Sequence, residues 1–232
     1  MNFLSDIMRT NTFECPYIAD TKACYDIFYA DNVSGDELSY FLSRGWRKFS
    51  SHFFRPACPE CRKCVPVRVL TELFEASKSQ RRVIRQNASV QTSFGKLEYS
   101  PDLFEIYRNH SLSRFAKDAD KDEFFRLFFS PPCESLLSEY TIDGELFAGG
   151  FLDVAADALS SIYFVYKDSH ARLSPGTYST IAEVLHAKEM GKEYYYLGYY
   201  IETNHHMNYK NRFYPHELYD WQNERWIRHD KP

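Results

Sequence analysis

The chain has 232 residues and a formal net charge of −4, and aromatic residues make up 17% of it. A chain of this length can bury a substantial hydrophobic core, and its aromatic content is too high for an intrinsically disordered protein. No apolar run approaches the roughly 18 residues of a membrane-spanning helix, and the N-terminus lacks the basic head and apolar run of a secretion signal. We therefore expect a cytoplasmic protein that does not bind membranes.

Charge is distributed unevenly along the sequence. Residues 1–43 carry a net charge of −5, residues 44–85 carry +8 and residues 86–232 carry −7. One concentrated basic block in an acidic protein favours contact with a polyanion at a single place. A solvated basic surface without a partner is the alternative.

The first part of the chain is expected to combine short helices and strands. Residues 34–46 predict a helix, with Ser34 and Glu37 as a capping box and Gly45 at its end. Residues 46–70, aromatic and interrupted by proline, indicate short strands around a cysteine knuckle. The basic residues 74–87 predict the start of another short helix.

The second part changes character. Residues 100–115 and 120–129 predict helices, and residues 145–154 and 159–167 predict a hairpin of two strands. A helix over 174–191 follows, with Ser174 as its cap and Pro175 at its first position, and then a strand over 194–201. This order indicates a mixed α/β (α+β) fold. We expect an N-terminal cysteine-rich basic domain over 1–95 and a catalytic domain over 96–232.

Cys58, Cys61 and Cys64 follow one another at a strict three-residue spacing. A zinc or iron–sulfur site needs a fourth ligand, for which Cys15 is the best candidate, with Cys24 behind it. Metal binding, reduced structural thiols and a catalytic thiol all stay open at this point. The arginines and lysines around the cluster are expected to lower the thiol pKa values.

Other sequence signatures of chemistry are weak. Residues 172–177 form a turn into a predicted helix N-terminus, whose free amides can hold a phosphate or an oxyanion. Any turn from a strand into a helix looks similar. The chain has no phosphate-binding P-loop, no nucleophile elbow and no zinc-protease helix motif.

Four segments in combination resemble the arginyl-tRNA–protein transferase family, and in particular its short bacterial branch, the aspartate/glutamate leucyltransferases. They are residues 43–69, "SKSQRRV" at 77–83, "YYYLGYYI" at 194–201 and "MNYKNRFYPHEL" at 207–218. The resemblance runs from about Cys15 to Trp226. It implies transfer of leucine from leucyl-tRNA to the N-terminal amine of proteins that begin with Asp or Glu, which marks them for degradation. It also implies an acetyltransferase-like (GNAT) mixed sheet with helices on both faces.

The implied reaction is aminolysis of an activated ester, so no cofactor is required for the chemistry. A structural zinc ion or iron–sulfur cluster is the group that Cys15, Cys58, Cys61 and Cys64 would hold. Contacts with tRNA are expected from cationic and hydrogen-bonding side chains. These candidates are Lys78, Gln80, Arg81, Arg82, Arg85, Arg172, Tyr209, Lys210 and Arg212.

Two further roles need residues. Either Arg81 or Arg82 would instead read the acidic side chain of the protein substrate, because an arginine fork matches a carboxylate. A weak base or an oriented water beside the attacking amine is expected near the predicted core strands. Each candidate for this role could instead be a packed tyrosine or a solvated acid without a catalytic role. These catalytic candidates are Tyr163, Asp153, Tyr199 and Glu202.

Three other functions stay open from the sequence. Arginine could replace leucine as the transferred residue, since the lining of the aminoacyl pocket cannot be read from the sequence. A GNAT-type acetyltransferase that uses acetyl-CoA would have the same fold, although the basic block far upstream argues against it. A non-enzymatic RNA-binding or redox-sensing protein built on the cysteines is the third.

Overall fold

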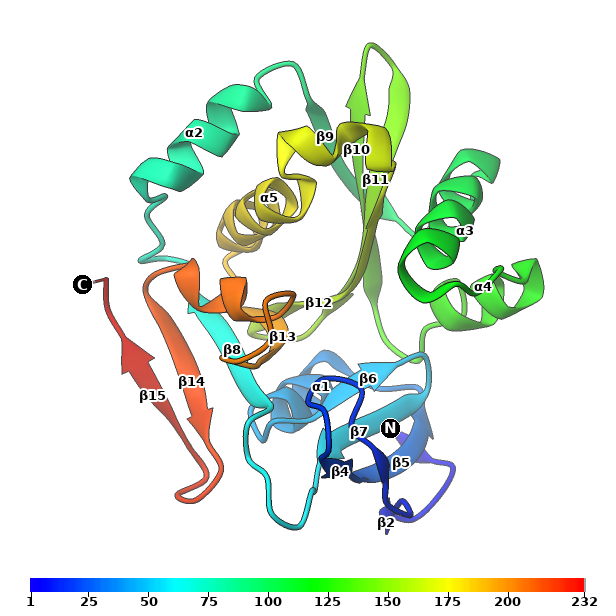
Figure 1. The fold of residues 1–232 in the computed structure, drawn as a ribbon, viewed down its shortest axis with the longest axis vertical. Coiled ribbons are helices and arrows are strands. Elements are labelled where there is room, and N and C mark those ends of the chain that lie inside the picture. Colours follow the sequence, from blue (N-terminus) through cyan, green and yellow to red (C-terminus); the bar gives the residue numbers. More distant parts are fainter. Residues whose placement is uncertain (232) are drawn as a thin grey trace.

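In a computed structural model that describes residues 1–231, the chain forms a mixed α/β fold around an eight-stranded sheet (Figure 1). A smaller five-stranded sheet lies near the N-terminus, and helices pack against both sheets. The mixed α/β class predicted from the element order is thus confirmed. Within the described residues, no helix has both the length and the apolar composition that crossing a membrane requires.

The large sheet has the strand order β15-β14-β8-β13-β12-β11-β10-β9. Its strands are β8 (Val65–Leu70), β9 (Gln91–Lys96), β10 (Ser135–Ile142), β11 (Glu145–Val154), β12 (Ala158–Tyr166), β13 (Tyr194–Tyr200), β14 (His216–Asp220) and β15 (Arg225–His229). Neighbours pair antiparallel except β12 and β13, which are parallel. The hairpin predicted over 145–167 is confirmed as β11 and β12. Because β8 pairs with β13 and β14, the sheet contains strands from both sides of residue 95; the division into domains 1–95 and 96–232 stays a prediction.

The smaller sheet is built from the first 56 residues. It comprises β1 (Asn2–Phe3), β2 (Met8–Arg9), β5 (Tyr25–Asp31), β6 (Arg47–Phe49) and β7 (His52–Pro56), while β3 (Phe13–Glu14) and β4 (Lys22–Ala23) form a separate short hairpin. Helix α1 (Gly35–Leu42) packs on it through Leu38, next to Phe28 and Phe53. The predicted capping box is present: Ser34 Oγ accepts from the Glu37 amide, and the Glu37 carboxylate accepts from the Ser34 amide.

Helices cover both faces of the large sheet, with α3 (Pro101–Phe115) and α4 (Lys121–Phe128) on one side and α5 (Pro175–Glu189) on the other (Figure 1). Two consecutive glycines of β11 show why both layers fit closely. A Cβ on Gly149 would lie 2.5 Å from Leu103 of α3, whereas a Cβ on Gly150 would lie 2.8 Å from the Glu183 carboxylate of α5. Consecutive residues of a strand face opposite sides, so each glycine makes room for one layer.

The start of α5 differs from its prediction in one respect. Ser174 lies at the N-cap with φ of 53°, and its side chain makes no capping hydrogen bond. Its carbonyl instead accepts from the amides of Thr177 and Tyr178, with Pro175 at the first helical position as predicted. One short 3₁₀ turn, η1 (Asp168–Leu173), precedes α5, and another, η2 (Asn208–Arg212), follows β13.

Candidate active site

Helix α2 (Lys78–Gln86) carries four of the eleven basic residues of the basic block at residues 44–85. It begins with a second capping box, in which Ser77 Oγ accepts from the Gln80 amide and Gln80 Oε1 accepts from the Ser77 amide. Four cations of this helix are exposed, and none forms an ion pair with an acid among residues 1–231. They are Lys78, Arg81, Arg82 and Arg85. Such a surface is available to a polyanion.

Two buried amide side chains hold α2 in place. Gln80 Nε2 donates to the Arg212 carbonyl at 3.2 Å, and Asn87 Nδ2 donates to the Leu173 carbonyl at 2.9 Å. The helix is therefore fixed to η2 at its first turn and to η1 at its end. These bonds bring the exposed Arg172 of η1 and Arg212 of η2 beside the basic helix. In Figure 1, α2 lies on the outer side of α5.

The parallel strands at the centre of the large sheet separate after a short stretch. β12 and β13 pair only over Ala158–Ser160 and Tyr194–Tyr196, although both strands continue beyond these residues. Arg47 of β6 occupies the point of separation. Its Nη1 donates to Ser160 Oγ at 2.9 Å, and its Nη2 donates to the Ser161 carbonyl. A side chain from the smaller sheet thus forms hydrogen bonds with β12 at the centre of the large sheet.

A second cation reaches the same point. Gly198 of β13 has φ of +94°, and the register with β8 shifts between Tyr196 and this glycine. A Cβ on Gly198 would lie 3.3 Å from Lys210 Nζ and 3.6 Å from Arg47 Nη2. Burial, together with the charge of Arg47, lowers the pKa of Lys210 to about 7. The two cations therefore converge on an irregularity in the sheet at Gly198, which has no side chain of its own.

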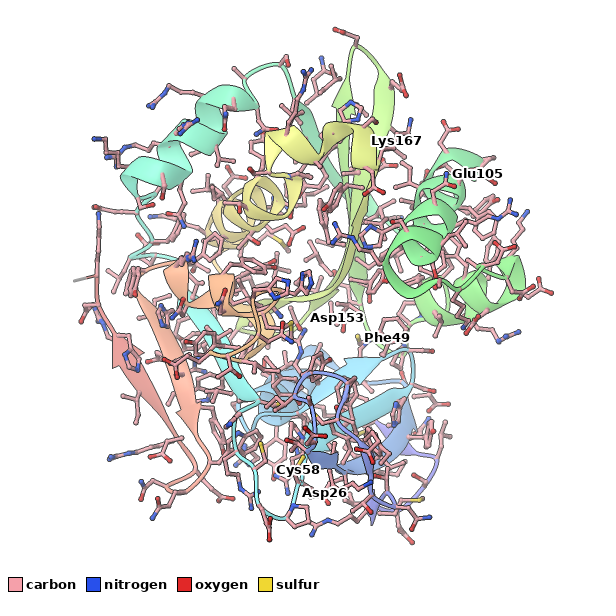
Figure 2. All side chains as sticks on the ribbon, in the orientation of Figure 1. Asp26, Phe49, Cys58, Glu105, Asp153 and Lys167 are labelled. Atoms are coloured by element: carbon pink, nitrogen blue, oxygen red, sulfur yellow. The ribbon has the colours of Figure 1, made fainter. Side chains whose placement is uncertain are left out.

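The residue next to Arg47 forms a buried ion pair. Lys48 Nζ lies 2.9 Å from Asp153 Oδ2, and each side chain is less than 5% exposed. Asp153 Oδ1 also accepts from Ser135 Oγ at 2.9 Å. Figure 2 shows Asp153 between the two sheets, near Phe49. Adjacent residues of β6 thus join the smaller sheet to two strands of the large one.

The carboxyl group of Glu183 is buried between α5 and the large sheet. Glu183 of α5 is 2% exposed and accepts hydrogen bonds from Ser138, Tyr140 and Tyr195. Burial raises the pKa of Glu183 to about 7, against the opposing effect of the three hydroxyl donors. This cluster ties α5 to β10 and β13, and it lies within the protein core.

Two family models match most of this chain. The model described as the N terminus of arginine-tRNA-protein transferase matches residues 13–82, and the model of its C terminus matches residues 100–220. The chain belongs to the arginine-tRNA-protein transferase family. It is therefore a transferase, and the resemblance noted in its sequence is confirmed.

Curated relatives cover nearly the whole transferase. An aspartate/glutamate leucyltransferase of Marinobacter nauticus is 31% identical over 215 residues, which is 90% of each chain. One from Pseudomonas fluorescens is 31% identical over 225 residues, or 94% of each chain. One from Campylobacter jejuni is 27% identical over 212 residues, covering 88% of this chain and 89% of the relative.

Solved structures give more distant matches. A structure titled as L-PGS from Bacillus licheniformis is 14% identical with a TM-score of 0.49, covering 77% of this chain and 54% of that one. A structure of FemX is 10% identical with a TM-score of 0.46, covering 76% and 63% of the respective chains.

The four catalytic candidates lie in different surroundings. Tyr163 packs among aromatic rings, including Phe128 at 5.5 Å between centroids, and burial raises its pKa to about 12. Asp153 is bound by Lys48. Tyr199 is buried and donates to the Gly45 carbonyl at 3.1 Å. Glu202 is exposed beyond the end of β13. The structure does not gather these side chains around one point, and their catalytic role stays a prediction.

The candidates for tRNA contact are gathered more closely. Gln80 and Arg212 are joined by a hydrogen bond, and η2 carries Tyr209 and Lys210 in the same turn. Tyr209 is half-buried against Phe213, and burial raises its pKa to about 12. The exposed cations of α2 and the half-buried Lys210 therefore lie on neighbouring elements but in different environments.

The cysteines cluster without forming a coordination site. Burial raises the pKa of Cys64 to about 12, and the neighbouring Cys15, Cys58 and Cys61 raise it further, so the lowering expected from basic neighbours is wrong for this thiol. Cys58 Sγ donates to the Cys24 carbonyl at 3.6 Å. Across residues 1–231, no three His, Cys, Asp or Glu side chains are arranged to hold a metal ion. Four thiols are suitable donors for zinc or iron, but their present arrangement does not fit one ion.

Sequence reasoning missed Arg47 and Lys48. Both stand in the segment "WRKF", where strand alternation would expose at least one of two consecutive cations. In the structure both are less than 9% exposed. Their placement between aromatic residues in a predicted strand is the signal that could have indicated buried partners.

Proposed function

We propose that the protein transfers leucine from leucyl-tRNA to the N-terminal amine of proteins that begin with Asp or Glu, which marks them for degradation. The observation that carries this proposal is the match to aspartate/glutamate leucyltransferases at 31% identity over at least nine tenths of both chains. The fold that we propose is the acetyltransferase-like (GNAT) type. It is supported by a mixed sheet whose central parallel strands separate after three residue pairs.

In the proposed reaction, the neutral amine of the acceptor protein attacks the carbonyl carbon of the leucyl ester. The ester bond to the terminal ribose breaks, the ribose hydroxyl takes up a proton, and a peptide bond forms. The ester is already activated, so the enzyme contributes mainly by holding both reactants in the correct orientation. The point where β12 and β13 separate would place them beside backbone groups that do not pair between the two strands.

The basic face of α2 would bind the phosphates of tRNA. Its four cations are exposed and unpaired among the described residues, and their helix is anchored to the turn that carries Lys210. Phosphate contacts of this kind supply affinity and set the orientation of the nucleic acid. The 3′ end of the tRNA would then extend from α2 toward the separated strands.

The decisive experiment measures transfer of labelled leucine or arginine from the corresponding charged tRNA to peptides that begin with Asp, Glu or Ala. We expect leucine transfer to the Asp and Glu peptides and none to the Ala peptide. Arginine transfer in place of leucine would favour the activity that the family description names. Acetylation from acetyl-CoA without aminoacyl transfer would contradict the proposal.

For the cysteine cluster we propose a structural role; zinc or an iron–sulfur cluster is the ligand that its four thiols would take only if they moved from their present arrangement. The thiol of Cys64 is buried, and Cys24 donates through its own thiol to the Ala57 carbonyl at 3.0 Å. Replacing Cys58, Cys61 and Cys64 by serine should lower the melting temperature and any metal content before it affects transfer. A fully folded triple variant without activity would contradict this role.

A further inference from the structure

Two basic side chains, those of Arg47 and Lys210, meet where β12 and β13 separate, and the described residues provide an ion-pair partner for neither. Arg47 Nη2 and Lys210 Nζ lie 3.6 Å and 3.3 Å from the position of a Cβ on Gly198. No carboxylate oxygen among residues 1–231 lies within 4.0 Å of either cation. The charge of Asp153 acts on Arg47, but this carboxylate already pairs with Lys48 at 2.9 Å.

Such a pair of cations is a binding site for an anion. Arg47 is 8% exposed and has lost most of its hydration, and each cation disfavours the charge on the other. A bound anion would relieve both costs. Arg47 uses two hydrogen bonds to hold Ser160 and Ser161, and a guanidinium has five N–H donors, so donors remain for a ligand.

We propose that Arg47 and Lys210 bind the side-chain carboxylate of the acidic N-terminal residue of the acceptor protein. This inference rests on the proposed leucyl transfer and deepens it. A carboxylate is small and singly charged, which suits a pair of cations of which one is buried and the other half-buried. The phosphate backbone of tRNA is bulky and carries many charges, which suits the exposed cations of α2 instead.

This placement would also orient the reacting amine. In an N-terminal Asp or Glu the amine is only a few bonds from the side-chain carboxylate, so fixing the carboxylate at Gly198 fixes the amine beside the separated strands. Beyond Ser160, β12 has no pairing with β13, and an extended peptide can pair with a free strand edge. Arg47 is held by two hydrogen bonds, whereas the flexible stem of Lys210 can adjust to the extra methylene of Glu.

The test compares peptides that begin with Asp and with its neutral isostere Asn, using Lys210→Met and Arg47→Lys. The controls are Lys96→Met on the exposed edge strand β9 and Arg44→Gln, an exposed arginine three residues from Arg47. We expect Lys210→Met to raise the KM for the Asp peptide by about tenfold to a hundredfold, the value of a charge-assisted hydrogen bond. The KM for leucyl-tRNA should change by less than about twofold. Both controls should match the wild type.

Arg47→Lys keeps a cation while removing the planar fork, so it should weaken Asp binding without loss of the fold, as checked by thermal unfolding. If either variant raised the KM for tRNA while leaving the preference for Asp over Asn intact, the carboxylate assignment would be overturned. Calorimetric titration of the Asp and Asn peptides without tRNA separates this inference from the proposed function. A wild-type protein that binds Asp over Asn but transfers no leucine would refute only the proposed function.

Discussion

At the scale of single residues, the most informative side chains are buried charges. A buried charge is tolerated only when a partner or a ligand compensates it. Lys48 and Asp153 compensate each other at 2.9 Å, and Glu183 is held by three hydroxyl groups. Buried Arg47 and half-buried Lys210 differ, since neither has an ion-pair partner among the described residues. The first three therefore stabilise the fold, and the last two are assigned to a ligand.

Lys48→Met should lower the free energy of unfolding by about 3–5 kcal/mol, because it leaves Asp153 buried without its partner. The double variant Lys48→Met/Asp153→Asn should recover part of this loss. The measurement is guanidinium unfolding at neutral pH. Lys117→Met is the matched control, because Lys117 pairs with Glu123 at 2.9 Å on the exposed surface and such pairs contribute less than about 1 kcal/mol. A loss at Lys48 no larger than at Lys117 would count against the buried pair.

The raised pKa of Glu183 predicts that the stability of the protein depends on pH. Its pKa is raised in the folded state, from 4.5 to about 7, so the folded protein binds this proton more tightly than the unfolded chain. The contribution to stability is therefore complete below about pH 4.5 and is lost as the pH rises through 7. Glu183→Gln removes the titration and keeps a polar group that Tyr195 can bond.

The free energy of unfolding of the wild type, relative to Glu183→Gln, should fall by about 2–3 kcal/mol between pH 5 and pH 8. Urea unfolding of both proteins at each pH gives this difference and cancels the groups that they share. A difference that stays constant over this range would show that Glu183 is ionised in the folded protein throughout.

At the scale of elements, the sequence predicted the features that neighbouring residues determine, such as the starts of helices. The capping box of Ser34 and Glu37 defines the start of α1, and proline at its first position defines α5. Strand β10 escaped prediction because its polar Ser138 interrupts the apolar pattern, and only the structure shows that Ser138 bonds Glu183. Arg47 also escaped prediction, because its partner Ser160 lies on β12, far away in the sequence.

Helix α2 offers a test at this scale. Replacing Lys78, Arg81, Arg82 and Arg85 by glutamine should weaken tRNA binding and reduce the slope of log affinity against log salt by about one for each contact removed. Because all four side chains are exposed, the circular dichroism spectrum and melting temperature should stay unchanged. Fluorescence anisotropy over a range of salt concentrations measures the slope. An unaltered slope would place the tRNA on another surface.

At the scale of the whole molecule, the two sheets share a buried hydrophobic cluster. Tyr196 of the large sheet belongs to the same buried cluster as Phe28 and Phe53 of the smaller sheet. Arg47 and Lys48 add hydrogen bonds and an ion pair between them. The order of predicted elements suggested a boundary near residue 95, but that order carries no information on which strands pair.

Differential scanning calorimetry should therefore show a single unfolding transition whose calorimetric and van't Hoff enthalpies agree. Two resolved transitions would instead support independent domains over 1–95 and 96–232. Gly149→Ala serves as a sensitive probe, since its added methyl would meet Leu103 at 2.5 Å in one layer only. If the molecule unfolds as one unit, this local overpacking lowers the temperature of the entire transition.

The position of β8 also affects the order in which the protein can assemble during synthesis. This apolar strand leaves the ribosome early, yet its neighbours β13 and β14 begin only at Tyr194 and His216. Until they emerge, both edges of β8 have no partner strand within the large sheet, and unpaired apolar strands are prone to aggregation. We expect nascent chains stalled before Tyr194 to require chaperones, whereas chains released after His229 should fold without them.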